Sequence, residues 1–167
     1  MRFLHGAEAK QASAEYDQAI AAAHEATCRR SKCGSVIVRD GAVVGRGFNS
    51  PPGDLESQRR CHLDKSQYGK GFKSDRTCCI HAEQRAILDA SVRNPDKLAG
   101  SRLYFIRLDG EDRPKKSGRP YCTHCSKLAL DAGIAEFVLW HDEGICVYPT
   151  EEYNDLSYAH GLEEPGE

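Results

Sequence analysis

Apolar residues recur at two different spacings along the chain, and these spacings predict helices and strands in alternation. Alanine and other apolar residues lie three to four positions apart in residues 13–27 and 81–92, as in amphipathic helices. Apolar runs predict two hairpin strands at 35–38 and 42–49 and two buried strands at 103–106 and 134–140. Strands that alternate with helices indicate an α/β layer structure with a mixed sheet.

Turn and cap residues complete this prediction. Asp40-Gly41 separates the first two strands and favours the positive φ angles of a tight hairpin turn. Gly133 suits the left-handed cap of a helix over 122–132. Glu151 and Glu152 suit the positive end of a last helix over 150–160. The polar segment 109–120, basic at its centre, is predicted to be an exposed loop.

Length and charge narrow the class of protein. The chain has 167 residues and a net charge of −2, which predict a single domain over residues 1–167 and argue against a nucleic-acid-binding protein. We find neither an apolar run long enough to cross a membrane nor a secretion signal. We therefore expect a cytoplasmic protein, in which the eight cysteines are reduced and serve as metal ligands or catalytic thiols.

Three groups of residues together indicate a metal centre with a catalytic acid. His81-Ala82-Glu83 begins one predicted helix, and Cys122 and Cys125 begin another. Two thiols and one imidazole are suitable zinc ligands, and a site with three protein ligands keeps a position for water, whose pKa zinc lowers to roughly 7. Glu83 would then move the proton from water to the substrate. Taken alone, Glu83 is better explained as an exposed helix carboxylate.

These residues resemble the zinc-dependent cytidine and deoxycytidylate deaminases, whose signature is H-x-E followed by P-C-x-x-C. The resemblance extends from about Ser13 to Trp140 and is greatest to the deoxycytidylate (dCMP) deaminases. It includes Cys28 after the first helix and three further segments: Gly34-Ser35-Val36-Ile37-Val38, Gly47-Phe48-Asn49-Ser50 and His81-Ala82-Glu83-Gln84-Arg85-Ala86-Ile87.

The resemblance implies a three-layer α/β/α cytidine-deaminase-like fold with a mixed five-stranded sheet. It implies that His81, Cys122 and Cys125 bind a catalytic zinc ion and that Glu83 transfers protons while dCMP is hydrolysed to dUMP and ammonia. Asn49 matches an asparagine that helps to hold the nucleotide. A homo-oligomer, often a hexamer, and control by dCTP and dTTP are also implied.

Three departures from the family pattern concern the substrate. Arg85 replaces an asparagine, Tyr121 replaces the proline before the first zinc cysteine, and Pro52 stands where many relatives have a basic residue. Arg85 or Arg93 could instead bind a 5′-phosphate, although a solvated surface arginine explains each equally well. The substrate could therefore also be a different or modified pyrimidine nucleoside or nucleotide, or a base in nucleic acid.

Residues 50–80 have few large apolar side chains, and such a long segment needs another means of fixation. The resemblance implies a second, structural zinc ion bound by Cys28, Cys61 and Cys79, with His62 or Cys78 as the fourth ligand. Metal binding can supply folding free energy to this insert. The alternative is that these thiols are small buried apolar groups.

A different class of function is a nucleic-acid-binding module in which all the zinc is structural. It would require paired C-x-x-C units and a basic face. The chain has a single C-x-x-C. The basic loop from Arg113 to Arg119 is the one feature that supports the nucleic-acid-binding alternative.

Overall fold

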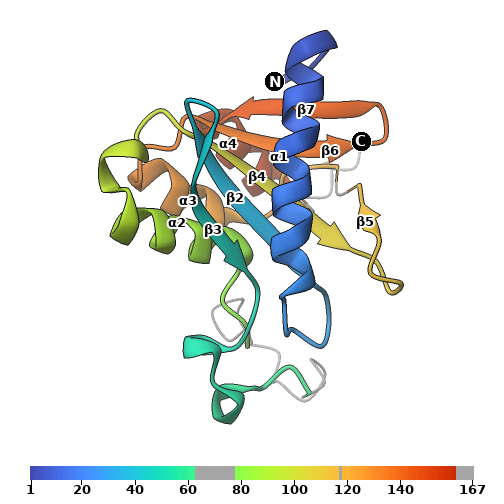
Figure 1. Ribbon diagram of the computed structural model, residues 1–167, viewed down its shortest axis with the longest axis vertical. Helices are drawn as coiled ribbons and strands as arrows, with labels where there is room; N and C mark the ends of the chain where they lie inside the picture. Colours follow the sequence, from blue (N-terminus) through green and yellow to red (C-terminus); the bar gives the residue numbers. More distant parts are fainter. Residues whose placement is uncertain (63–77, 117, 161–167) are drawn as a thin grey trace, which may run out of the picture.

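The computed structural model describes residues 1–62, 78–116 and 118–160, and in these ranges one mixed sheet organises the fold (Figure 1). Its strands follow the order β1-β7-β6-β4-β2-β3, and β5 pairs with β4. They are β1 (Arg2–Phe3), β2 (Cys33–Arg39), β3 (Ala42–Phe48), β4 (Arg102–Leu108), β5 (Pro114–Lys115), β6 (Glu136–His141) and β7 (Gly144–Pro149).

The described sheet therefore has seven strands and not the predicted five. Five of them are six or seven residues long, whereas β1 and β5 have two residues each and are too short to show a hydrophobic pattern. β7 lies in a segment for which no strand was predicted. The hairpin prediction is confirmed, because Asp40 (φ 51°) and Gly41 (φ 74°) form the turn between β2 and β3.

Helices cover both faces of the sheet, which confirms the three-layer prediction. They are α1 (Gly6–His24), α2 (Ala82–Arg93), α3 (Thr123–Asp131) and α4 (Thr150–Ala159), with 3-10 turns η1 (Pro52–Asp54), η2 (Glu56–Gln58) and η5 (Pro95–Lys97). α1 lies on one face, and the other three helices lie on the opposite face (Figure 1). α1 begins at Gly6, before the predicted Ser13. The prediction missed these first turns because they contain no large apolar residue.

Strand β4 shows how the two faces are filled. Leu103 and Phe105 belong to the core under α2 and α3, whereas Tyr104 and Ile106 belong to the core under α1. This alternation follows from the two-residue period of a strand and explains why 103–106 is apolar throughout. In the described ranges, no helix is both long and apolar enough to cross a bilayer.

The topology brings two helix N-termini to one edge of the sheet. β3 and β4 both pair with β2 in antiparallel fashion, so they run in the same direction. α2 follows β3 along the chain, and α3 follows β4. Because each helix starts beyond the carboxyl end of its strand, both helices start at the same edge, where ligands of α/β proteins commonly bind.

Gly47 allows α2 to lie close to β3. A Cβ atom at this position would lie 2.2 Å from the carbonyl oxygen of Ala82 and 2.4 Å from the backbone nitrogen of Ala86. These atoms belong to the first turns of α2 and cannot move away as a flexible side chain could. The absence of a side chain at Gly47 thus sets the position of the helix that carries Glu83.

We predict that Gly47→Ala lowers the free energy of unfolding by about 1–3 kcal/mol, because the added methyl group overpacks the contact between β3 and α2. Urea denaturation measures this change. Gly110→Ala is the matched control, since a Cβ there meets nothing within 4 Å. The control should differ from wild type by less than about 0.5 kcal/mol. Equal stabilities for the two variants would contradict the account of the close contact.

Candidate active site

His81, Cys122 and Cys125 come together where α2 and α3 begin. The Nδ1 atom of His81 lies 3.3 Å from the sulfur of Cys125 and 3.4 Å from that of Cys122, and the two sulfurs are 3.3 Å apart. Both cysteines are buried and His81 is half-buried. Two elements that are distant in the sequence thus supply one compact group of metal-ligating atoms.

Helix capping places two of these residues. His81 is the N-cap of α2, and its backbone N–H donates to the side-chain oxygen of Gln84 at 3.1 Å, which is half of a capping box. Cys122 is the N-cap of α3, and Cys125 lies one turn further along the same side. The three ligating groups therefore extend from helix ends, whose positive dipoles favour thiolates.

The electrostatics of the cluster favour a metal-binding charge state. Hydrogen bonds from the Cys125 thiol and from His81 lower the pKa of Cys122 to about 4, although burial opposes this shift. The adjacent Cys122 thiolate in turn raises the pKa of Cys125. A metal ion would remove this conflict, because it stabilises both sulfurs as thiolates.

The distances fit a zinc ion. Zinc–sulfur bonds of ~2.3 Å and zinc–nitrogen bonds of ~2.0–2.1 Å in a tetrahedral site place the two sulfurs about 3.8 Å apart and each sulfur about 3.5–3.6 Å from the nitrogen. The three observed distances of 3.3–3.4 Å are slightly shorter, so a small outward movement of the ligands would admit the ion. Sulfur and nitrogen ligands also suit zinc better than magnesium or calcium.

Glu83 lies in the first turn of α2, with only 3% of its surface exposed. Burial raises the pKa of its carboxyl group, whereas the positive charge of His81 opposes the rise. Its carboxyl group also interacts with the Cys125 thiol. Glu83 is therefore no exposed helix carboxylate: it is a buried acid beside the ligand cluster, in an environment typical of proton-transferring groups.

Asn49 is buried and connects two segments near this site. Its Oδ1 accepts a hydrogen bond from the backbone N–H of Cys33 at 2.8 Å, and its Nδ2 donates to the carbonyl of Ser31 at 2.8 Å. With these bonds made, the amide nitrogen keeps a second hydrogen that could reach a ligand. Asn49 thus already holds the start of β2 against the end of β3.

The two arginines considered for phosphate binding have different surroundings. Arg85 donates to the carbonyl of Pro51 at 2.7 Å and lies over the ring of Phe48, so it ties α2 to the segment after β3. Arg93 is exposed at the last turn of α2 and pairs with Asp89 at 2.8 Å. Arg93 lies ten positions after Glu83, which is about 15 Å along the helix axis. The structure therefore does not bring Arg93 to the ligand cluster.

Sequence reasoning overlooked Arg107, at the carboxyl end of β4. Its Nη2 atom donates to the hydroxyl of Tyr121 at 3.0 Å, and Tyr121 directly precedes the metal-ligating Cys122. The positive charge of Arg107 also acts on His81, where it disfavours the protonated imidazole. An arginine at the end of an apolar strand was the available signal, because the carboxyl ends of such strands border ligand sites.

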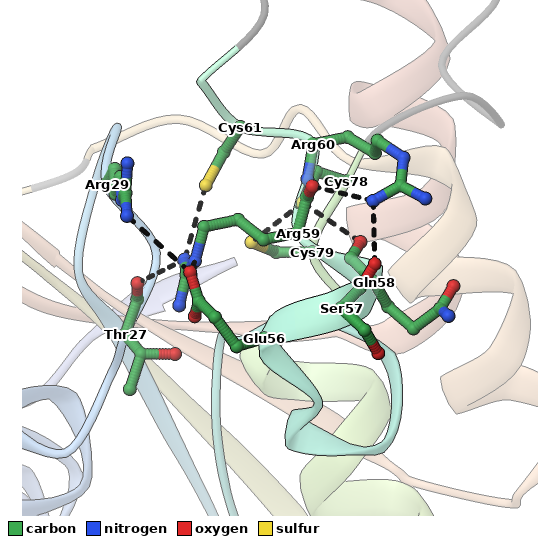
Figure 2. A network of polar contacts seen from close by, with 10 residues as sticks. All are labelled: Thr27, Arg29, Glu56, Ser57, Gln58, Arg59, Arg60, Cys61, Cys78 and Cys79. Atoms are coloured by element: carbon green, nitrogen blue, oxygen red, sulfur yellow. Dashed lines mark hydrogen bonds and ion pairs between the residues drawn. The ribbon is translucent and has the colours of Figure 1, made fainter.

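Cys28, Cys61 and Cys79 form a second group, with their sulfurs within 4.8 Å of one another. Figure 2 shows how Arg59 supports it: the guanidinium donates to the carbonyl of Thr27 at 2.7 Å and to the sulfur of Cys61 at 3.3 Å. Burial opposes ionisation here, but the backbone of Arg29 and the charge of Arg59 lower the pKa of Cys61 to about 7. These features also fit a thiolate-bound metal ion.

The two candidates for a fourth ligand differ in position. Neither belongs to the group of three whose sulfurs lie within 4.8 Å of one another, and His62 is exposed. The sulfur of Cys78 lies 3.9 Å from that of Cys79 and accepts a hydrogen bond from the backbone N–H of Arg60 at 2.9 Å (Figure 2). Residues 63–77 of the predicted insert lie outside the described residues.

Comparison with known sequences agrees with this site. Residues 9–141 match the family described as the cytidine and deoxycytidylate deaminase zinc-binding region. The deoxycytidylate deaminase of Mycobacterium phage D29 is 33% identical over 125 residues, which cover 72% of this chain and 86% of that protein. The deoxycytidylate deaminase of Saccharomyces cerevisiae is 26% identical over 72% of this chain but only 34% of its own length.

Solved structures share the fold. The dCMP deaminase of cyanophage S-TIM5, in complex with dCMP and dUMP, superposes with a TM-score of 0.53 at 22% identity, over 80% of this chain and 82% of that chain. A cytidine deaminase from Burkholderia pseudomallei gives 0.50 at 20% identity, over 84% of this chain and 94% of that one. With a family match that includes His81, Cys122 and Cys125, the chain belongs to the zinc-binding cytidine and deoxycytidylate deaminases.

Proposed function

We propose that this protein removes the amino group of dCMP by hydrolysis, giving dUMP and ammonia. The observation that carries the proposal is the group His81–Cys122–Cys125 with the buried carboxyl of Glu83 beside it. The names of the relatives from phage D29 and yeast support dCMP as the substrate. A different or modified pyrimidine nucleotide remains the alternative, because Arg85 and Pro52 depart from the family pattern.

Each residue of the site has a defined task in this proposal. His81, Cys122 and Cys125 would hold the catalytic zinc ion, which supplies activation of water when bound. Glu83 would take a proton from the attacking water and deliver it to N3 of the pyrimidine as the C4–O bond forms. It would then move the proton of the new C4 hydroxyl group to the amino group, so that the C4–N bond breaks, ammonia leaves and the carbonyl of uracil forms. Burial suits Glu83 to this exchange, since its raised pKa lies nearer to neutrality than that of an exposed glutamate.

We also propose a structural zinc ion at Cys28, Cys61 and Cys79, with Cys78 rather than the exposed His62 as its fourth ligand. Four protein ligands would close this site to water, whereas the three ligands at His81 leave a position open. The second ion would fix the segment that enters α2.

Further expectations complete the proposal. We propose that the protein forms a homo-oligomer, such as a hexamer, and that dCTP and dTTP regulate it. Both proposals follow from the family resemblance. We also propose a cytoplasmic location, as the sequence leads us to expect. We propose that residues 1–167 form one deaminase domain.

Ammonia release tests the function. We expect dCMP to be deaminated with a kcat/KM at least about tenfold higher than that of deoxycytidine, because a bound phosphate adds charge-assisted hydrogen bonds. Initial rates should be compared for dCMP, CMP, deoxycytidine and 5-methyl-dCMP, with and without dCTP and dTTP. Zinc-loaded protein that releases no ammonia from any of these compounds would contradict the proposal.

Glu83→Gln should lower kcat by about 10²–10⁴-fold, because glutamine has the shape of glutamate but cannot transfer a proton. Its zinc content, measured by mass spectrometry, should equal that of wild type, since Glu83 is not a ligand. Glu151→Gln, an exposed carboxylate in the first turn of α4, is the matched control and should retain full activity. Retained turnover in Glu83→Gln would exclude the assigned role.

Zinc analysis also distinguishes one site from two. We expect two equivalents per wild-type chain and one equivalent in each of Cys122→Ser and Cys61→Ser, because each variant loses one thiolate ligand. Only Cys122→Ser should remove the ion needed for turnover directly. Cys146→Ala, outside both clusters, should keep two equivalents. A single equivalent in wild type would contradict the structural site.

A further inference from the structure

A basic cavity adjoins the active site, on the side formed by Arg107 and Tyr121. Its volume is about 520 Å³, and four cationic side chains line it: Arg107, Lys115, Lys116 and Arg119. Asp142 is the acidic side chain in its lining, and it pairs with Lys116 at 3.9 Å. Three positive charges remain after this pairing, although the chain as a whole is slightly negative.

Arg107 is the most buried of these cations. Its Nε atom is buried without a hydrogen-bond partner among the residues that the structure describes, although the sulfur of Cys33 interacts with the same guanidinium. Buried donors are normally paired, so a ligand could supply the acceptor that this N–H group lacks. The guanidinium has five N–H donors, and Tyr121 accepts one of them.

The cavity is also next to the reacting centre. Tyr121 lines it and is joined by a peptide bond to Cys122, a member of the ligand cluster. Tyr121 has 38% of its surface exposed, and its ring packs 5.9 Å from that of His160, another lining residue. A ligand that occupies both the cluster and the cavity would therefore lie near Tyr121.

We propose that Arg107, supported by Lys115, Lys116 and Arg119, binds the 5′-phosphate of the pyrimidine nucleotide. This assignment rests on the proposed function, because it places the base at Glu83 and the phosphate in the basic cavity. A phosphate monoester carries about −1.5 to −2 charges at pH 7, which matches several cations better than a carboxylate would. Arginine also offers the planar pair of donors that phosphate oxygens accept.

This proposal assigns phosphate binding to Arg107 instead of Arg85 or Arg93, the two candidates from the sequence. Arg85 also has an unpaired Nε atom, but its Nη2 atom donates to backbone carbonyls and it does not line the cavity. Arg93 is at the far end of α2. Arg107 instead extends from the strand that leads into the loop before Cys122. The loop contributes the two lysines and Arg119. Phosphate binding would therefore explain why this loop is basic, without a role in binding nucleic acid.

The test compares ligands that differ only in the phosphate. Calorimetry should measure the binding of dUMP and deoxyuridine, and kinetics should measure the turnover of dCMP and deoxycytidine. In Arg107→Gln we expect the affinity for dUMP and the kcat/KM for dCMP to fall about 10- to 100-fold, the effect of losing a charged hydrogen-bond pair. The values for deoxyuridine and deoxycytidine should fall by a smaller factor, so that the preference for the phosphorylated ligand decreases.

The double variant Lys115→Gln/Lys116→Gln keeps the test valid if Arg107→Gln folds poorly, because both lysines are exposed. It should weaken dUMP binding about three- to tenfold, and added salt should reduce the difference from wild type. Lys10→Gln, exposed on α1, is the matched control and should bind dUMP as wild type does.

The outcomes separate this proposal from the function on which it rests. Wild-type protein that deaminates dCMP, combined with an unchanged preference for dCMP over deoxycytidine in Arg107→Gln, would overturn the phosphate site alone. Loss of a dCTP response with intact dCMP turnover would also overturn it, in favour of an effector site. Protein that releases no ammonia, yet binds dUMP through Arg107, would overturn the deaminase and retain the phosphate site.

Discussion

The site depends on one topological constraint: β3 and β4 run in the same direction on either side of β2, so α2 and α3 start at one edge of the sheet. Only then can His81 and Cys122, which cap these helices, approach within 3.4 Å. The helix ends supply both position and electrostatics, because their dipoles stabilise the thiolates that bind metal. Gly34 serves the opposite face in the same way as Gly47: a Cβ there would lie 2.1 Å from the carbonyl oxygen of Ala19 in α1.

The relative placement of candidate residues can be predicted best where their arrangement is local. His81, Glu83, Cys122 and Cys125 lie within one turn of two helix starts, so spacing alone shows which groups share a side of each helix. Arg107 could not be found in this way, because its importance comes from Tyr121, fourteen residues away across an irregular loop. Similarly, the two residues of β1 form a strand only by pairing with β7, which is far away in the sequence, so their local pattern could not predict it.

Polar residues around the site also have structural bonds that a motif does not reveal. Asn49 matches a nucleotide-binding position, yet two of its hydrogen bonds hold the start of β2. Arg85 similarly ties α2 to the carbonyls that follow β3. Substitution of either residue would therefore change the shape of the site as well as its contacts with a ligand. A loss of activity at these positions alone cannot identify a substrate-binding residue.

The two cysteine clusters are mechanically connected through the entry to α2. Cys79 belongs to one cluster and His81 to the other, and only Ile80 separates them. The backbone N–H of Ile80 donates to the carbonyl of Ser50 at 3.0 Å, which fixes this short segment to the residues after β3. Arg59 holds the second cluster to the end of α1 through Thr27. A metal ion at Cys79 would therefore restrain the position of His81 by two residues of backbone, so that a structural ion can influence a catalytic ligand that it does not touch.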